Sequence, residues 1–274
     1  RPDPARPGCP PEAALDFLRH EPELPFVDSL VQLNARLYGE FDQPDPDELR
    51  RLSEVYLAWG FGAEARQILD NLAGAVDGRD LMLGLADLLD DRASNARLRL
   101  AGLIHCPAPV PLFAALAGAP PAAVRDRAEA LVAQFQSAPS GLRLALGPGL
   151  VELLLGLGAI DAARMTLDSL DRIAPRDSAA LHRLAAALDH ARGQTERAAQ
   201  RLDATAGGRL DALQLRLEIA LERAEALVPQ LLDDAAILAE AHRSSEGGRA
   251  ILDLVIRHHA AAGRPETGLS WLDR

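Results

Sequence analysis

The stretch from Leu52 to Leu72 reads LSEVYLAWGFGAEARQILDNL, and it has the pattern of two helices joined by a short turn. A first apolar helix ends near Gly60, and a second helix follows with the small residue Ala65 in its first turns. Glycine is typical of helix ends because it takes a positive φ without steric cost. The stretch therefore predicts an antiparallel helical hairpin.

The same pattern returns at 150–170 as LVELLLGLGAIDAARMTLDSL, and weaker copies follow at 185–205 and 255–274. The turn glycines Gly158 and Gly193 lie 35 positions apart. A recurrence near 34 residues is typical of stacked helical hairpins, because one hairpin cannot bury its own apolar face. The spacing predicts an all-α chain that folds as a right-handed α-solenoid of antiparallel helical hairpins.

The composition favours helices over strands. Hydrophobic residues make up 48% of the 274 residues and aromatic residues only 4%. The apolar residues are mostly leucine and alanine, which are strong helix formers, and no segment alternates with the period of two that strands show. The longest apolar runs, such as 153–157, are far too short to span a bilayer, so we expect no integral membrane segment.

The charge of the chain excludes several classes of function. The formal net charge is -11, which opposes binding to nucleic acid or to anionic lipid. All 29 basic residues are arginine, which we interpret as a bacterial coding bias. The lack of lysine excludes Schiff-base mechanisms and the lysine of a phosphate-binding loop.

The repeated phrases resemble the tetratricopeptide repeat, a family of helical hairpins. The tryptophan that often begins such a repeat is absent, since Trp59 lies elsewhere, and residues 74–148 follow the pattern only loosely. The resemblance implies a tetratricopeptide-like superhelix whose concave groove holds a peptide or a partner helix. The matching positions are Leu52, Tyr56, Gly60, Ala65 and Leu69; Leu150, Leu154, Gly158, Ala163, Leu167 and Pro175; Gly193, Ala198 and Leu202; and Gly263 and Leu272, where Gly268 replaces the alanine.

The start of the chain differs from the rest. Residues 1–25 are expected to form a proline-rich tether with a short helix at 11–20, and residues 26–274 the helical-repeat solenoid. Because the chain begins at Arg1 rather than at methionine, we expect an upstream segment such as a cleaved signal. We therefore expect a soluble protein that is periplasmic or otherwise exported.

The chain has two cysteines, Cys9 in the tether and Cys106 in the loop IHCPAP, and a proline follows each. One interpretation is a disulfide that fastens the amino-terminal segment to the array, which requires an oxidising compartment. The other is a pair of unrelated thiols, because two cysteines without characteristic spacing indicate little.

The sequence contains no pattern of a catalytic, cofactor or metal site. His182 and His190 are eight positions apart and His258 and His259 are adjacent, whereas a helical metal pair needs a spacing of three or four. The acidic clusters lack the alternating ligands and glycine of a calcium loop. We therefore expect no enzyme activity.

These observations favour a noncatalytic scaffold or assembly factor of the bacterial cell envelope, which binds a protein or peptide in its groove. Helical register places Arg51 and Arg183 on the groove side of first helices as candidate partner-binding residues. The alternative is a helical-repeat hydrolase or lyase with an acidic cleft. Such an enzyme needs aromatic platforms and paired acids, and the chain has only 2 Trp, 2 Tyr and 6 Phe.

Overall fold

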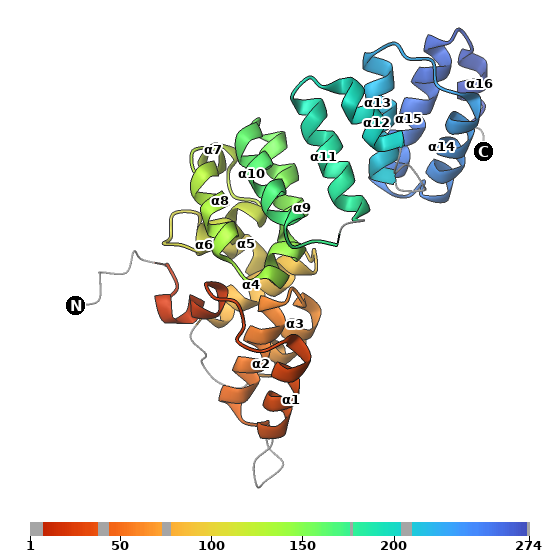
Figure 1. Cartoon of the computed structure of the whole chain (residues 1–274). Helices are drawn as coiled ribbons and strands as arrows, with labels where there is room; N and C mark the ends of the chain where they lie inside the picture. The colour runs from red at the N-terminus through yellow and green to blue at the C-terminus, as the bar shows by residue number, and fades with distance from the viewer. Residues whose placement is uncertain (1–7, 38–43, 73–77, 176–177, 204–209, 273–274) are drawn as a thin grey trace. The chain divides into compact units, whose positions relative to one another are not determined.

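A computed structural model describes residues 8–37, 44–72, 78–175, 178–203 and 210–272 (Figure 1). These residues form sixteen α-helices and one 3-10 helix, and none of them lies in a β-strand, so the prediction of an all-α chain is confirmed. Residues 1–7 of the expected tether lie outside the described residues. The short helix expected at 11–20 is the 3-10 helix η1.

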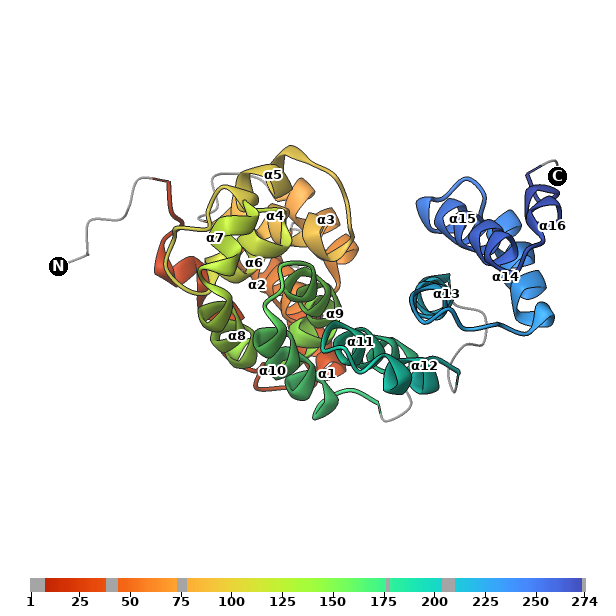
Figure 2. The same cartoon turned by 90° about the horizontal axis from the view of Figure 1, so that it is seen from above.

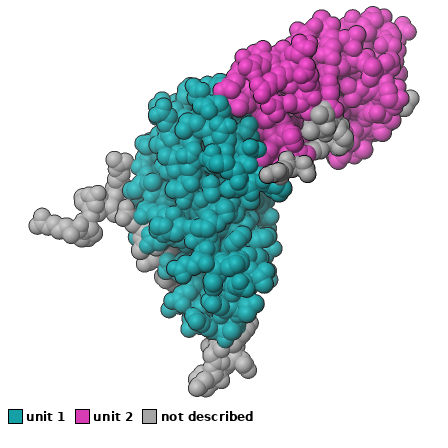
Figure 3. All heavy atoms as spheres, in the orientation of Figure 1, with its two compact units in different colours: residues 1–176 teal, residues 177–274 magenta. Residues whose placement is uncertain are grey.

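The chain divides into two compact units, residues 1–176 and 177–274 (Figure 3). The boundary expected at residue 25 lies inside unit 1. The helices of unit 1 are η1 (Glu12–Leu18), α1 (Phe26–Arg36), α2 (Pro46–Ala58), α3 (Gly62–Asn71), α4 (Arg79–Leu89), α5 (Asn95–Ala101), α6 (Val110–Leu116), α7 (Pro121–Arg125), α8 (Ala128–Ser137), α9 (Ser140–Gly156) and α10 (Ile160–Asp171). Those of unit 2 are α11 (Ala179–Ala191), α12 (Thr195–Asp203), α13 (Leu210–Glu222), α14 (Pro229–Ala241), α15 (Glu246–Ala261) and α16 (Pro265–Leu269).

One turn geometry ends seven of these helices. In each case a residue with positive φ follows the helix, and its N–H donates to the carbonyl of the residue three positions earlier. The N–H of the residue after it donates to the carbonyl of the residue five positions earlier. This is the Schellman arrangement, which satisfies carbonyls at the end of a helix. The residues with positive φ are Gly60, Asp91, Gly118, Gly158, Gly193, Ala224 and Gly263.

Two of the seven turns have no glycine. Asp91 and Ala224 take φ values of 46° and 49°. No glycine stands between α13 and α14, yet Ala224 ends α13 with the same hydrogen bonds that Gly193 makes after α11. A side chain in this conformation costs about 1–2 kcal/mol.

A small residue follows six of these turns at the fifth position, inside the next helix. Five of these small residues are buried, which allows the two helices of each pair to approach closely. Leu272 of the fourth predicted copy is 58% exposed, so that position is not a core position. The six residues are Ala65, Ala96, Ala123, Ala163, Ala198 and Gly268.

In unit 1, helices far apart in sequence pack together. α2 and α9 belong to the two clearest copies of the repeated phrase, and they contact each other directly. The contact is close because residue 141 is glycine: a Cβ there would lie 2.8 Å from the Cα of Trp59. Contact between elements some 90 residues apart means that unit 1 is not held together by neighbouring helices alone.

A buried carboxylate ties three consecutive helices of unit 1. The guanidinium of Arg66 on α3 donates to both carboxylate oxygens of Asp87 on α4, and Asp87 is almost fully buried. The hydroxyl of Ser94 also donates to Asp87, while the same hydroxyl oxygen caps α5 by accepting from the N–H of Arg97. A buried charge is tolerated when it is paired and hydrogen-bonded in this way.

In unit 2, each helix packs mainly against the next one or two helices along the chain. α11 contacts α12 and α13, α13 contacts α14 and α15, and α15 contacts α14 and α16. Figure 2 shows α14, α15 and α16 side by side. This order of contacts is the one expected for consecutive helical pairs.

Arg216 on α13 holds the polar centre of unit 2. Its side chain is only 5% exposed, and it lies 2.7 Å from Asp203 of α12 and 2.6 Å from Glu225 of the loop after α13. Burial alone would lower the pKa of Arg216, but the hydrogen bonds to Glu225 and Asp203 raise it. The same bond from Arg216 lowers the pKa of Glu225.

Candidate binding pocket

Cys9 and Cys106 lie together at disulfide distance, with Cα atoms 5.6 Å apart across a sequence separation of 97 residues. The prediction that the two cysteines meet is confirmed. The guanidinium of Arg19 donates to the carbonyl of Ala108, at 2.9 Å, in the same loop as Cys106. Both contacts join the amino-terminal segment to the loop before α6.

The two candidate partner-binding arginines lie in different units and in different surroundings. Arg51 on α2 has 59% of its side chain exposed, lies 2.7 Å from Glu48 and lines a cavity. Arg183 on α11 has only 14% of its side chain exposed and lies 2.7 Å from Asp211. Arg51 thus stays a candidate partner-binding residue, and Arg183 takes part in the contact between α11 and α13.

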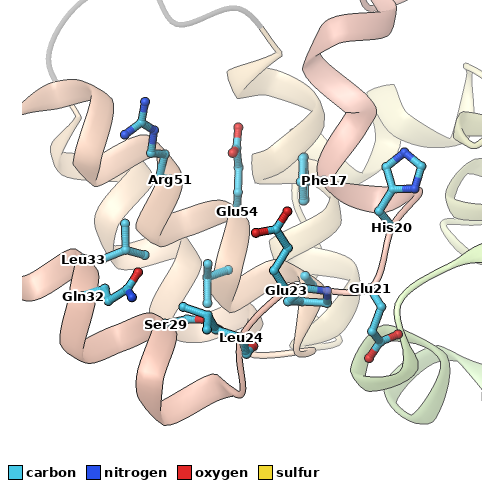
Figure 4. Close-up of a pocket in the computed structure, with 13 residues that line it drawn as sticks. Phe17, His20, Glu21, Glu23, Leu24, Ser29, Gln32, Leu33, Arg51 and Glu54 are labelled. Carbon is cyan, nitrogen blue, oxygen red and sulfur yellow. Dashed lines mark hydrogen bonds between the residues drawn. The ribbon is translucent and has the colours of Figure 1, made fainter.

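The cavity beside Arg51 has a volume of about 370 Å³ and lies entirely within unit 1 (Figure 4). Segment 17–24 forms one wall, α1 a second and α2 a third. We call it the 17–24 cavity. Its lining comprises Phe17, His20, Glu21, Pro22, Glu23 and Leu24; Ser29, Gln32 and Leu33; and Arg51, Glu54, Val55 and Ala58.

Segment 17–24 is fixed by buried and polar contacts on both sides. Leu18 and Ala14 of η1 are almost fully buried. Farther along, the carboxylate of Glu21 accepts hydrogen bonds from the backbone N–H and the hydroxyl of Ser140. Ser140 is the first residue of α9, so Glu21 satisfies a free N–H at the positive end of the helix dipole.

Two features fix the helices that form the other walls. Asp45 caps α2, since its side chain accepts from the N–H of Asp47 at 2.8 Å. Phe26, the first residue of α1, stacks on Phe61 with ring centroids 4.8 Å apart and also contacts Tyr56 and Trp59. Aromatic pairs of this geometry contribute about 0.5–1.5 kcal/mol each.

The charged groups at the 17–24 cavity are mostly acidic. Oε1 of Glu54 accepts from Nε of Arg50 at 2.9 Å, yet burial raises the pKa of Glu54 despite this opposing contact. Glu23 is exposed and has no hydrogen bond or ion pair with any part of the chain that the structure describes. Figure 4 shows Glu23 projecting into the space between segment 17–24 and α2.

Sequence reasoning singled out the arginine of this cavity and missed its carboxylates. Glu21 and Glu23 stand in the proline-bounded stretch EPELP, which predicts only a break between helices. The place of segment 17–24 at this cavity depends on the long-range contact of Glu21 with Ser140. No spacing in the sequence connects residues 21 and 140.

Two adjacent histidines of unit 2, His258 and His259, are buried. Nε2 of His258 donates to the carbonyl of Leu217 at 2.9 Å, and burial lowers the pKa of His258. His259 is buried without a hydrogen bond to its ring among the described residues, and burial lowers its pKa as well. Within the described ranges, no group of three or more His, Cys, Asp and Glu side chains is placed to hold a metal ion.

Comparison with known proteins adds no family to this geometry. Among the described helices, none combines the length and the apolar character that crossing a membrane requires. No protein-family model matches the chain, and no curated protein matches it.

Proposed function

We propose that the chain is a noncatalytic interaction module of the bacterial cell envelope, a scaffold or assembly factor built as a right-handed tetratricopeptide-like solenoid. The repeated helix-ending turn supports this proposal most directly. Seven helices end in the same hydrogen-bonded geometry, and a small residue follows six of the turns at the same offset. Stacked hairpins of this kind present extended surfaces that bind polypeptides.

The 17–24 cavity supports a binding role within that scaffold. It is open to solvent beside exposed Arg51, and its volume is at the small end of the range of about 300–1,000 Å³ typical of ligand pockets. The meeting of Cys9 and Cys106 supports export to an oxidising compartment, where a disulfide persists.

Capture of the partner from native envelope extract tests the proposal. The Arg51→Glu variant should change recovery of the partner, lowering it if the partner is acidic there and raising it if the partner is basic. Arg243→Glu is the matched control, since Arg243 is exposed and lies 3.0 Å from Glu240 three residues earlier, as Arg51 lies near Glu48. Equal recovery by wild type and Arg51→Glu would reject this surface.

The alternative of a helical-repeat hydrolase or lyase rests on one observation. Glu23 and Glu54 line the same cavity, and burial raises the pKa of Glu54, as a general acid requires. Against it, Phe17 is the one Phe, Tyr or Trp among the described residues that line the cavity, which is poor support for a platform for sugar rings. Hydrolysis of polysaccharide or chromogenic glycosides by the purified protein, abolished in Glu54→Gln, would replace the scaffold proposal with the enzyme.

A further inference from the structure

We infer that the 17–24 cavity takes a basic side chain, an arginine or a lysine next to an apolar residue, from the partner polypeptide. This inference rests on the proposed binding function and names the partner's chemistry at that site. Exposed Arg51 by itself would instead suggest a ligand with a negative charge.

The balance of charge at the cavity favours a cation. Among the described residues that line it, Glu23 and Glu54 present carboxylates to the cavity and Arg51 a guanidinium, whereas the carboxylate of Glu21 bonds to Ser140 of α9 (Figure 4). Arg51 is already engaged by Glu48 at 2.7 Å, and Glu54 shares one oxygen with Arg50. Glu23 remains as a carboxylate without a partner inside the described part of the chain.

The walls of the cavity suit the stem of a long basic side chain. Phe17, Leu24, Leu33 and Val55 form apolar surface beside the carboxylates. Arginine and lysine lay their aliphatic stems along apolar surface while the charged head stays near water or a counter-ion. A cavity of about 370 Å³ has room for one such side chain and part of a neighbour.

An acidic ligand would meet the opposite conditions. Its carboxylate would approach Glu23 and Glu54 while competing with Glu48 for Arg51. Burial already disfavours the charged form of Glu54, and a second anion would disfavour it further. A cation has the reverse effect, so binding should lower the pKa of Glu54.

The test uses n-butylguanidinium as a probe of the arginine side chain and n-butylurea as its uncharged isostere, with binding followed by NMR of the isotope-labelled protein. We expect saturable shifts of the backbone signals of Leu24, Glu54 and Val55 with butylguanidinium, and at least severalfold weaker binding of butylurea. Glu23→Gln should weaken binding of the cation by roughly threefold, the size expected for an exposed ion pair. Since Glu23 makes no contact that supports the fold, this variant should keep the wild-type spectrum elsewhere.

Asp28→Asn is the matched control, because Asp28 is an exposed carboxylate of α1 outside the cavity lining. It should bind butylguanidinium as wild type does. The inference fails if no saturable shift occurs, if the shifts lie away from the cavity, if butylurea binds equally well, or if Glu23→Gln and Asp28→Asn behave alike. Capture of a partner that still depends on Arg51 would then leave the proposed function intact.

A second measurement follows from the same inference. In the capture experiment, Arg51→Glu should increase recovery of the partner, since it replaces the guanidinium at the cavity with a further carboxylate. Loss of recovery would support the binding surface and overturn the basic ligand, so the two claims fail separately.

Discussion

The two units achieve their packing in different ways. Unit 1 closes contacts between residues far apart in sequence: Cys9 with Cys106, Glu21 with Ser140, and α2 with α9. In unit 2 the main contacts join helices that are neighbours or next neighbours along the chain, and buried Arg216 of α13 pairs with Asp203 of α12 and with Glu225. The same helix-ending turn thus occurs both in a unit held by contacts between distant residues and in a unit held by contacts between successive helices.

The consequence for function lies in where a pocket forms. The 17–24 cavity requires segment 17–24, which the long-range contacts of unit 1 hold against α9. A purely sequential stack offers surfaces made by neighbouring helices only. The contrast predicts that each unit loses stability through a different kind of substitution.

The largest effect should come from removing the disulfide. The double variant Cys9→Ala and Cys106→Ala should lose about 2–5 kcal/mol of stability, because the bridge closes a long loop in the unfolded chain. The loss should be confined to unit 1, and butylguanidinium should bind more weakly as segment 17–24 loosens. Hydrogen exchange resolved by peptide measures both units at once, and equal acceleration in unit 2 would contradict the comparison.

Next in size is the removal of the buried cation of unit 2. Arg216→Met should cost about 2 kcal/mol, because it removes charge-assisted hydrogen bonds to Asp203 and Glu225. Urea unfolding followed by hydrogen exchange should show the loss in 210–222 and leave unit 1 unchanged. Arg243→Met, at an exposed site, should stay within about 0.5 kcal/mol of wild type; a similar loss there would remove the special role of Arg216.

A smaller effect should separate the glycine turns from the alanine turn. Ala224→Gly should stabilise unit 2 by about 0.5–1 kcal/mol, because glycine relieves the cost of positive φ, although it loses more conformational entropy on folding. Gly193→Ala should destabilise by a similar amount, since a Cβ there meets no neighbouring atom and the φ of 75° alone opposes it. The melting temperatures of the two variants test this prediction. Changes of the same sign in both would contradict a common positive-φ conformation at residues 193 and 224.

The smallest effect should appear on mild acidification. The folded-state pKa values of His258 and His259 lie below the unfolded value of about 6.5, so the unfolded chain binds more protons between those values. Stability of unit 2 should therefore be fully present above about pH 6.5 and decrease as the pH falls through that window. Glu225, whose pKa is lowered, adds a separate loss only below about pH 4.5.

The His259→Leu variant checks that assignment. In this variant the stability of unit 2, measured by urea unfolding at several pH values, should decrease less between neutral pH and the lowered pKa of His259. It should leave the loss below about pH 4.5 in place. An unchanged slope at mildly acidic pH would show that His259 does not control it.

The helices could be predicted from the sequence by their apolar spacing. Five of the seven turns could be predicted as well, because each contains a glycine, which takes a positive φ without steric cost. Asp91 and Ala224 take the same conformation and end their helices with the same hydrogen bonds, but neither residue type predicts a positive φ. Helical register picks out Arg51, but it does not reveal that Arg183 lies against Asp211 of a later helix. The 17–24 cavity could not be found, since it depends on contacts such as that of Glu21 with Ser140.

The hydrogen bonds between Glu21 and Ser140 also bear on how the molecule is made. The ribosome adds about 5–20 residues per second, so residue 21 waits on the order of ten seconds for its partner 119 positions later. Segment 17–24 is thus synthesised well before Ser140 and is among the last parts of unit 1 to acquire a fixed place. Unit 2, whose partners lie close behind one another, can assemble as fast as it emerges. The binding cavity is therefore a late product of synthesis, completed only when most of unit 1 exists.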